Sequence, residues 1–153
     1  MKELELKVPP PVVALCVALL MWAAARWLPG LRLLPVPPRV LPVLLAVLGA
    51  ASTIAGMASF RRLGTTVNPL QPAKATALVT GGIYRLTRNP MYLGLLLVLA
   101  GWALALGSVP AWAGPLVFVA WITRLQIQSE ERVLRGLFGA AYAAYCGRVR
   151  RWL

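Results

Sequence analysis

The fold is decided by one long uncharged stretch, residues 91–123, whose sequence is MYLGLLLVLAGWALALGSVPAWAGPLVFVAWIT. Its 33 residues are too many for one membrane-spanning helix, which needs about 20 apolar residues. The run Gly107-Ser108-Val109-Pro110 interrupts the stretch, and both glycine and proline favour turns. The stretch therefore predicts a tight hairpin of two spanning helices, over about residues 90–107 and 109–125.

Two further uncharged runs, residues 8–25 and 40–60, precede the hairpin, and each has about the length of one span. We predict an all-α integral membrane protein with about four transmembrane helices, at residues 8–28, 40–60, 90–107 and 109–125, followed by cytoplasmic amphipathic helices. The composition agrees, because 13% of the residues are charged, about half the share of a soluble domain. No repeat or domain boundary is visible, so we expect one transmembrane domain over residues 1–153.

The first run also has the features of a cleaved signal peptide. Lys2 and Lys7 precede it, and three alanines stand at its end, at residues 23–25. We expect an uncleaved first span instead, because the rest of the chain is itself predicted to be embedded in the membrane.

The net charge of +12 would suit a nucleic-acid partner, but the distribution of the charges has a different explanation. Four spans place both termini and the segment 61–89 on one side of the membrane, together with thirteen of the 16 Lys and Arg residues. The other side holds Arg26, Arg32 and Arg39. This asymmetry predicts cytoplasmic termini in an inner or plasma membrane, with membrane lipids and not nucleic acid as partners.

Several kinds of site are disfavoured by the residues that the chain lacks. It has no histidine, so a histidine base and a histidine metal site are excluded. Its two cysteines, Cys16 and Cys146, indicate neither a disulfide nor a metal site. We therefore expect no metal.

The second run has small residues at helical spacing, which let helices approach closely in lipid. These residues are Ala46, Gly49, Ala50, Ser52, Thr53 and Gly56. The pattern predicts a packing helix, and it leaves an oligomer possible.

Two polar segments are expected to close over a site on the cytoplasmic side, residues 61–89 and 126–153. The first is too long for a structureless connection, and it carries hydrophobic anchors. The second begins with an amphipathic helix over about residues 126–138, and Gly139 is a plausible stop before a second piece.

The chain has four acidic residues, Glu3, Glu5, Glu130 and Glu131, and the last two follow the fourth span. A regular helix places Glu130 on an apolar flank, where a carboxylate needs a cation. That cation is either Arg85 or Arg88, or belongs to a bound ligand. The same helix places Glu131 on an exposed face with Arg135, as a helical ion pair worth roughly 0.2–0.5 kcal/mol.

The third span is preceded by an unusually rich stretch, residues 81–94, GGIYRLTRNPMYLG. Asn89 and Pro90 suit a helix start, with Asn as the cap. Arg88 beside the positive helix end would make a site for a carboxylate or phosphate. Two tyrosines, Tyr84 and Tyr92, could lie at the membrane interface or stack on a flat ring. A ligand with a carboxylate for Arg88, a flat purine ring for the tyrosines and an ammonium for Glu130 matches S-adenosylmethionine.

Two motifs carry a resemblance to a known family. The first, at residues 82–94, contains Gly-Ile-Tyr and then Thr-Arg-Asn-Pro-Met-Tyr-Leu-Gly. The second, at residues 130–145, contains Glu-Glu-Arg-Val-Leu, then Phe-Gly and two tyrosines. In this order they resemble the membrane-embedded methyltransferases, which include isoprenylcysteine carboxyl methyltransferases and phospholipid N-methyltransferases. The resemblance covers about residues 64–151. Where the isoprenylcysteine enzymes usually have histidine this chain has Asn89, and its Asn-Pro-Met-Tyr form resembles the phospholipid enzymes.

The resemblance implies a site for S-adenosylmethionine. The implied binding residues are Tyr84, Arg88, Asn89, Pro90, Tyr92, Gly94, Glu130, Glu131, Tyr142 and Tyr145, and the implied catalytic residues are Glu130, Arg88 and Tyr92. We expect methyl transfer to a lipophilic acceptor with a carboxylate, as in an isoprenylcysteine, or a thiol. A carboxylate or thiolate acceptor needs alignment and no general base.

The sequence also allows other functions. One alternative is a phospholipid N-methyltransferase of the phosphatidylethanolamine type, in which Glu130 is the best candidate for the general base. Another is a membrane anchor without catalysis or a small transporter subunit. The spans carry no acid or histidine in their middle, which disfavours ion-coupled transport.

Overall fold

The computed structural model describes residues 8–28, 38–65 and 72–153, and all of their regular secondary structure is helical. The α-helices are α1 (Pro10–Trp27), α2 (Val40–Arg62), α3 (Pro90–Leu106), α4 (Ala113–Trp121) and α5 (Gln128–Arg148). Three short 3₁₀ turns, η2 (Pro72–Lys74), η3 (Gly82–Arg85) and η4 (Pro110–Trp112), and the π-helical turn η5 (Ile122–Ile127) complete the set. The all-α prediction is confirmed for this part of the chain.

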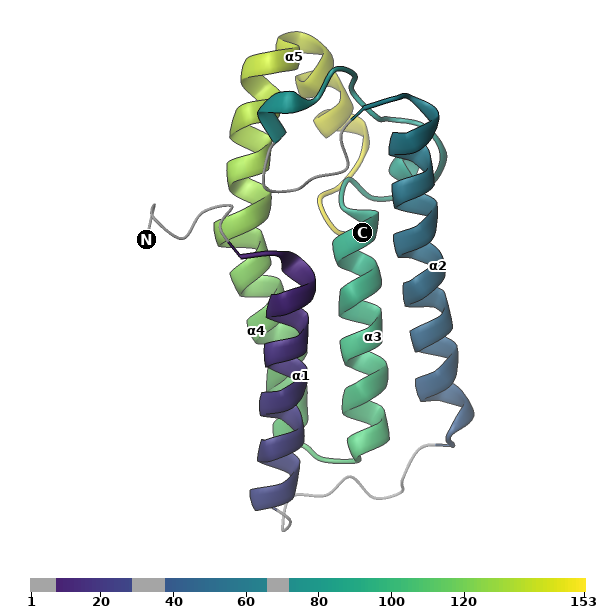
Figure 1. Ribbon diagram of the computed structural model, residues 1–153, viewed down its shortest axis with the longest axis vertical. Coiled ribbons are helices and arrows are strands. Elements are labelled where there is room, and N and C mark those ends of the chain that lie inside the picture. Colours follow the sequence, from purple (N-terminus) through teal and green to yellow (C-terminus); the bar gives the residue numbers. More distant parts are fainter. Residues whose placement is uncertain (1–7, 29–37, 66–71) are drawn as a thin grey trace.

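Helices α1 to α4 run alongside one another, with α2 packed on α3, and α1 packed on both α3 and α4 (Figure 1). The predicted turn between the last two helices lies where glycine and proline stand. Helix α3 ends at Leu106, Gly107 has a positive φ of 58°, and η4 begins at Pro110. The buried core between these helices includes Met21, Leu99, Phe118 and other apolar side chains.

Helix α4, the turn η5 and helix α5 follow one another directly and form one long helical run, which extends beyond the bundle (Figure 1). The predicted stop at Gly139 is a sharp bend, because this residue has φ 47° and ψ −122° inside α5. The second half of α5 turns back there, and the chain returns to the top of α3 (Figure 1). The bend brings the C-terminal part of the chain over the end of the bundle.

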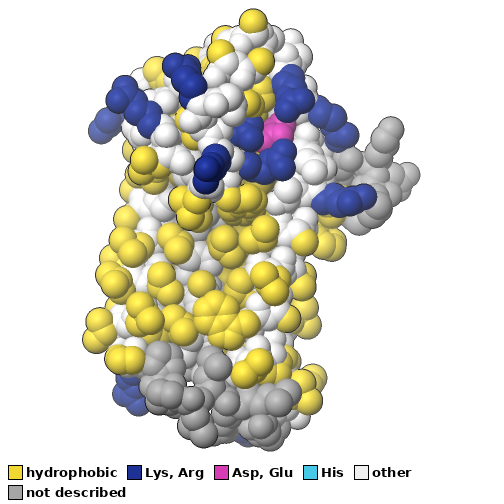
Figure 2. Space-filling view, turned by 180° about the vertical axis from the view of Figure 1, so that it is seen from behind, with side chains coloured by type: hydrophobic (Ala, Val, Ile, Leu, Met, Phe, Trp, Pro, Cys, Tyr) yellow, Lys and Arg dark blue, Asp and Glu magenta, His cyan; other side chains and the backbone are white. Residues whose placement is uncertain are grey.

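Two helices, α1 with 18 residues and α2 with 23, are long and apolar enough to cross a membrane by length and composition. Helix α3 is also apolar but has 17 residues, and α4 has nine before the π-helical turn. Figure 2 shows hydrophobic side chains over the middle and lower part of one face, and a gathering of Lys and Arg at the upper end. Exposed apolar residues include Leu19 and Leu20 of α1, Val43 and Val47 of α2, and Leu116 of α4.

Helix α2 approaches α3 through its small residues, as the sequence predicts. A Cβ atom on Gly49 would lie 2.5 Å from the carbonyl oxygen of Gly94. The hydroxyl of Ser52 donates a hydrogen bond of 2.7 Å to the carbonyl of Pro90. The buried small residues of α2, Gly49, Ser52 and Gly56, therefore pack against α3.

Candidate functional site

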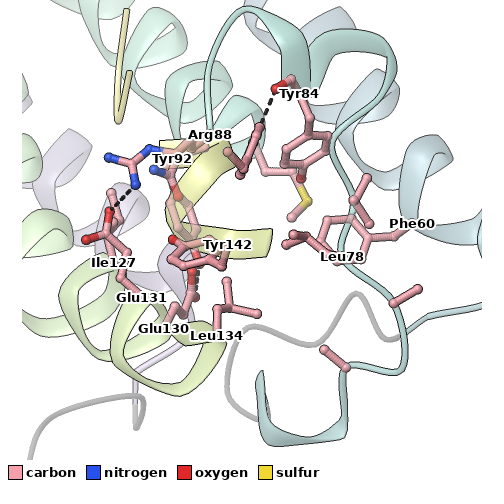
Figure 3. Close-up of a pocket in the computed structure, with 16 residues that line it drawn as sticks. Phe60, Leu78, Tyr84, Arg88, Tyr92, Ile127, Glu130, Glu131, Leu134 and Tyr142 are labelled. Carbon is pink, nitrogen blue, oxygen red and sulfur yellow. Dashed lines mark hydrogen bonds and ion pairs between the residues drawn. The ribbon is translucent and has the colours of Figure 1, made fainter. Parts of the chain in front are cut away.

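A pocket lies at the arginine-rich end of the bundle, between the start of α3, the start of α5 and the segment that follows α2 (Figure 3). The space among its lining residues measures about 820 Å³, part of which is open solvent. Its polar lining is Tyr84, Arg88, Asn89, Tyr92, Glu130, Glu131, Tyr142 and Tyr145. Its apolar lining is Phe60, Ala75, Ala77, Leu78, Val79, Met91, Ile127 and Leu134.

Of the ten residues expected to bind a cofactor, the structure brings eight to the pocket, namely the polar lining just given. Pro90 and Gly94 lie outside the pocket lining and instead contact α2. Both are buried in the interface of the two helices. Their place in the motif is thus explained by helix packing, because a larger residue at Gly94 would collide with Thr53 and Gly49.

Tyr84 is held at the pocket by two contacts that join distant parts of the chain. Its backbone carbonyl accepts a 2.7 Å hydrogen bond from the hydroxyl of Tyr145, and its ring meets Phe60 edge-on at 5.5 Å. Burial raises the pKa of Tyr84 and of Tyr145, so both stay neutral phenols at physiological pH. Tyr142 is buried as well, 6.3 Å from the ring of Tyr145. These rings give the pocket a rigid aromatic wall.

Glu130 lies deep in the pocket beside two neutral hydrogen-bond donors. The hydroxyl of Tyr92 and the side-chain amide of Gln126 both donate to its Oε1 atom, the latter at 2.7 Å. Burial raises the pKa of Glu130 to about 7, and the charge of Glu131 adds to this, although the two hydrogen bonds act in the opposite direction. Glu130 therefore titrates close to physiological pH.

Gln126 was not predicted as a site residue, although it stands four residues before Glu130 and thus one turn away on the same helix face. It belongs to the π-helical turn η5, and it is buried. A π-turn inserts a residue into an α-helix and is frequent at functional sites. Here it rotates the end of the α4 run relative to a regular helix, with Gln126 and Ile127 buried and Ile127 on the pocket wall.

Glu131 differs from its expected place as an exposed partner of Arg135. It is only 6% exposed, and the guanidinium of Arg151 donates to both of its carboxylate oxygens, at 2.9 and 2.8 Å. Arg88, which was a possible partner of Glu130, instead pairs with Glu131 at 3.3 Å. Burial alone would raise the pKa of Glu131, but the hydrogen bonds of Arg151 and the nearby positive charges outweigh it and lower the pKa. Glu131 is therefore a fixed anion.

Asn89 also differs from its expected role as a helix cap. It stands at the cap position of α3, but its side chain makes no capping hydrogen bond. Its amide donates to the carbonyl of Arg151 at 2.9 Å instead. The backbone N–H groups in the first turn of α3 are consequently without a side-chain cap, beside Arg88.

Residues 149–152, here called the return segment, connect the two motifs and were not anticipated from the sequence. The carbonyl of Arg150 accepts from the backbone N–H of Arg88 at 3.0 Å, and the carbonyl of Arg151 accepts from the hydroxyl of Thr87 at 3.3 Å. The indole N–H of Trp152 donates to Thr123 at 3.1 Å. No local pattern reveals these contacts, because they join residues 29 to 64 positions apart.

The pocket offers groups of opposite polarity to a ligand. Arg88 brings a positive charge to the pocket lining, and its buried Nε atom has no hydrogen-bond partner among the described residues. Glu130 can accept from a cation, and the tyrosine rings can stack on a planar group. Figure 3 shows Arg88 and the two glutamates on one side of the pocket, and Phe60 and Leu78 on the other.

The fold and the pocket together define an all-helical protein with membrane-spanning features and a polar, aromatic site at one end. A family model described as phospholipid methyltransferase matches residues 38–141, which are 104 of the 153 residues. The chain belongs to this family, and it is a membrane methyltransferase. This result confirms the resemblance noted from the motifs.

One relative is an uncharacterized protein of Haemophilus influenzae, 48% identical over 63 residues. The matched part is 41% of this chain and the whole of the relative. No solved structure matches the chain.

Proposed function

We propose that the protein transfers a methyl group from S-adenosylmethionine to a lipophilic acceptor at the membrane interface. One observation carries the proposal: the pocket sets an acid, Glu130, and an arginine with an unused buried donor, Arg88, among tyrosine rings, at the end of an apolar bundle. Enzymes of this family generally use this methyl donor. When bound, S-adenosylmethionine supplies a methyl group on a positive sulfur, which leaves as a neutral thioether.

The lining residues fit the chemical groups of the cofactor. Arg88 Nε and the uncapped first turn of α3 suit its carboxylate, and Glu130 suits its ammonium. The buried rings of Tyr84 and Tyr142 suit its purine. Glu131 would serve indirectly, because its charge is already shared by two arginines. The chain then acts mainly by orientation, which can contribute roughly 7–11 kcal/mol to a two-reactant step.

The acceptor is proposed to be a lipophilic carboxylate or thiol; a carboxylate, or a thiol already ionised to its thiolate, needs no base. A phospholipid amine is the second candidate, and a specific observation favours it. Glu130, with a pKa near 7 and hydrogen bonds from Tyr92 and Gln126, can take the proton that an amine loses on methylation. The two candidates make different demands on Glu130, since a carboxylate that pairs with the cofactor's ammonium is poorly free to act as a base.

We further propose four spans with the pocket end in the cytoplasm. Arg26 and Arg39 lie at the far end of α1 and α2, whereas the other described Lys and Arg residues lie towards the pocket end. This asymmetry supports the orientation. Labelling of Arg150→Cys and Arg39→Cys, each in a chain without Cys16 and Cys146, with an impermeant thiol reagent tests it. Labelling of Arg150→Cys from outside intact cells would contradict the orientation.

The cofactor is tested by calorimetry with S-adenosylhomocysteine on detergent-purified protein. Glu130→Gln is expected to weaken binding about tenfold or more, because a hydrogen bond to a charged group is worth about 1.5–3 kcal/mol. Tyr92→Phe removes the hydroxyl beside it and should weaken binding less. Arg124→Gln, an exposed change on the same helical run, is the control. Absence of binding to folded wild-type protein, with and without lipid, would refute the proposal.

The acceptor class is tested by incubating the protein with lipid extract and a cofactor that carries a labelled methyl group. A methyl ester releases its label as methanol in alkali, whereas an N-methyl or S-methyl product keeps it. Alkali-labile label in the lipid phase would identify a carboxylate. Alkali-stable label in phosphatidylethanolamine would identify the amine instead.

A further inference from the structure

We infer that Arg151 is a positioning residue of the pocket, which holds the buried carboxylate of Glu131 in place beside Arg88 and Glu130. This inference deepens the proposed function and rests on it for the roles of Arg88 and Glu130. Arg151 does not line the pocket and would not touch the ligand itself.

The side chain of Arg151 takes both oxygens of one buried carboxylate. Its Nε atom lies 2.9 Å from Oε1 of Glu131, and its Nη2 atom lies 2.8 Å from Oε2. This two-pronged contact is the strongest geometry for an arginine and a carboxylate. Arg88 makes the longer contact of 3.3 Å to the same carboxylate. Arg88 also donates from Nη1 to the Sγ of Cys146, and its Nε has no partner in the described chain.

The backbone of Arg151 fixes the same place from the other side. Its carbonyl accepts hydrogen bonds from Asn89 at 2.9 Å and from Thr87 at 3.3 Å. One residue thus joins the start of α3, through its backbone, to the start of α5, through its guanidinium. Arg150 is the matched comparison, because it is exposed and contributes only its carbonyl, at 3.0 Å from the N–H of Arg88.

The charges around Glu130 show why Arg151 matters for that residue. Tyr92 faces Glu130 from α3, Gln126 faces it from η5, and Glu131 adjoins it on α5. The charge of Glu130 in turn helps to raise the pKa of Tyr84 on η3. The positive charges of Arg88 and Arg151 stand behind Glu131. Removal of Arg151 leaves the negative charge of Glu131 less compensated and raises the pKa of Glu130 further. Removal of the charge on Glu131 lowers the pKa of Glu130.

Infrared titration of the unliganded protein tests this without any cofactor, because the chain has only four acidic side chains. Glu130→Gln identifies the carboxyl signal of Glu130. Arg151→Gln should shift its midpoint to higher pH, Glu131→Gln should shift it to lower pH, and Arg150→Gln should leave it unchanged. Shifts of opposite sign from the two members of one ion pair are not produced by a general loss of structure. An unchanged midpoint in folded Arg151→Gln would overturn the inference.

Binding of S-adenosylhomocysteine supplies the second measurement. Arg151→Gln should weaken it about 3- to 30-fold, the usual range for indirect coupling, and Arg150→Gln should not. Arg151→Lys keeps the positive charge but cannot contact both oxygens of Glu131, so the titration midpoint of Glu130 should stay near that of wild type while the affinity for S-adenosylhomocysteine falls. If Arg151→Gln does not fold, Arg151→Lys provides the test. Wild-type affinity in both Arg151 variants would overturn the inference and leave the proposed cofactor intact. Failure of the wild type to bind would refute the proposed function, and the titration would still decide the role of Arg151.

Discussion

The contact between Gly49 and Gly94 allows a stability prediction with a magnitude from the structure. A Cβ on Gly49 would stand 2.5 Å from the carbonyl oxygen of Gly94, whereas ordinary contact begins at 3.4 Å. The obstacle is backbone, so α2 and α3 must separate by about 0.9 Å, which is the difference of these two distances. Overpacking of this kind destabilises a protein by about 1–3 kcal/mol, and the higher helix propensity of alanine than of glycine offsets about 1 kcal/mol of this.

Gly49→Ala is therefore expected to destabilise the protein by up to about 2 kcal/mol, or roughly 4–8 °C in Tm for a chain of this size. Gly94→Ala should behave alike, since it meets Thr53 and Gly49 across the same contact. Gly136→Ala is the control, because this exposed helical glycine has nothing within 4 Å and should raise Tm slightly.

The assay is thermal unfolding in detergent followed by circular dichroism, with S-adenosylhomocysteine binding measured below the transition. A rise in the melting temperature of Gly49→Ala as large as that of Gly136→Ala would refute the close packing of α2 on α3. The binding measurement separates two roles of Gly94. A loss of affinity in Gly94→Ala that Gly49→Ala does not share would show that Gly94 serves the cofactor and not the packing alone.

Three further predictions concern the pocket end. The pKa of Glu130 is about 7 in the folded protein, above its unfolded value of 4.5. The contribution of Glu130 to stability is therefore present below pH 4.5 and is lost as the pH rises to 7. Glu130→Gln should flatten the dependence of Tm on pH over this window. Tyr145→Phe leaves the buried carbonyl of Tyr84 without its donor and should cost about 1–3 kcal/mol in chemical unfolding. Gly139→Ala should cost about 1–3 kcal/mol, since φ is 47° there, while Gly147→Ala, helical and unobstructed, should cost nothing in the same assay.

The elements that could be predicted from the sequence are those with local signals. The turn at Gly107 and Pro110 carries its own punctuation, and the bend at Gly139 follows from the residue that best tolerates a positive φ. The close approach of α2 to α3 follows from small residues at helical spacing. In each case the residues that decide the structure are neighbours along the chain or along one helix face.

The elements that could not be predicted depend on contacts between distant residues or on a change of helix type. Reasoning from a regular helix placed Glu131 on an exposed face, and nothing near it in the sequence signals Arg151, 20 residues later. The π-helical turn changes the phase of the helix before Gln126, so a rotation of 100° per residue fails across it. Asn89 fits the pattern of a cap, but its amide donates to the return segment instead.

The two adjacent glutamates show how the fold assigns different properties to one residue type. Two neighbouring buried carboxylates repel each other, so both can ionise only where positive charge compensates at least one of them. Arg151 and Arg88 compensate Glu131, and the neutral donors Tyr92 and Gln126 surround Glu130. Glu131 is thereby fixed as an anion, and Glu130 is left to titrate near pH 7. Substitution of Glu131 would consequently alter the pocket twice: it would release both arginines, and it would lower the pKa of the glutamate beside it.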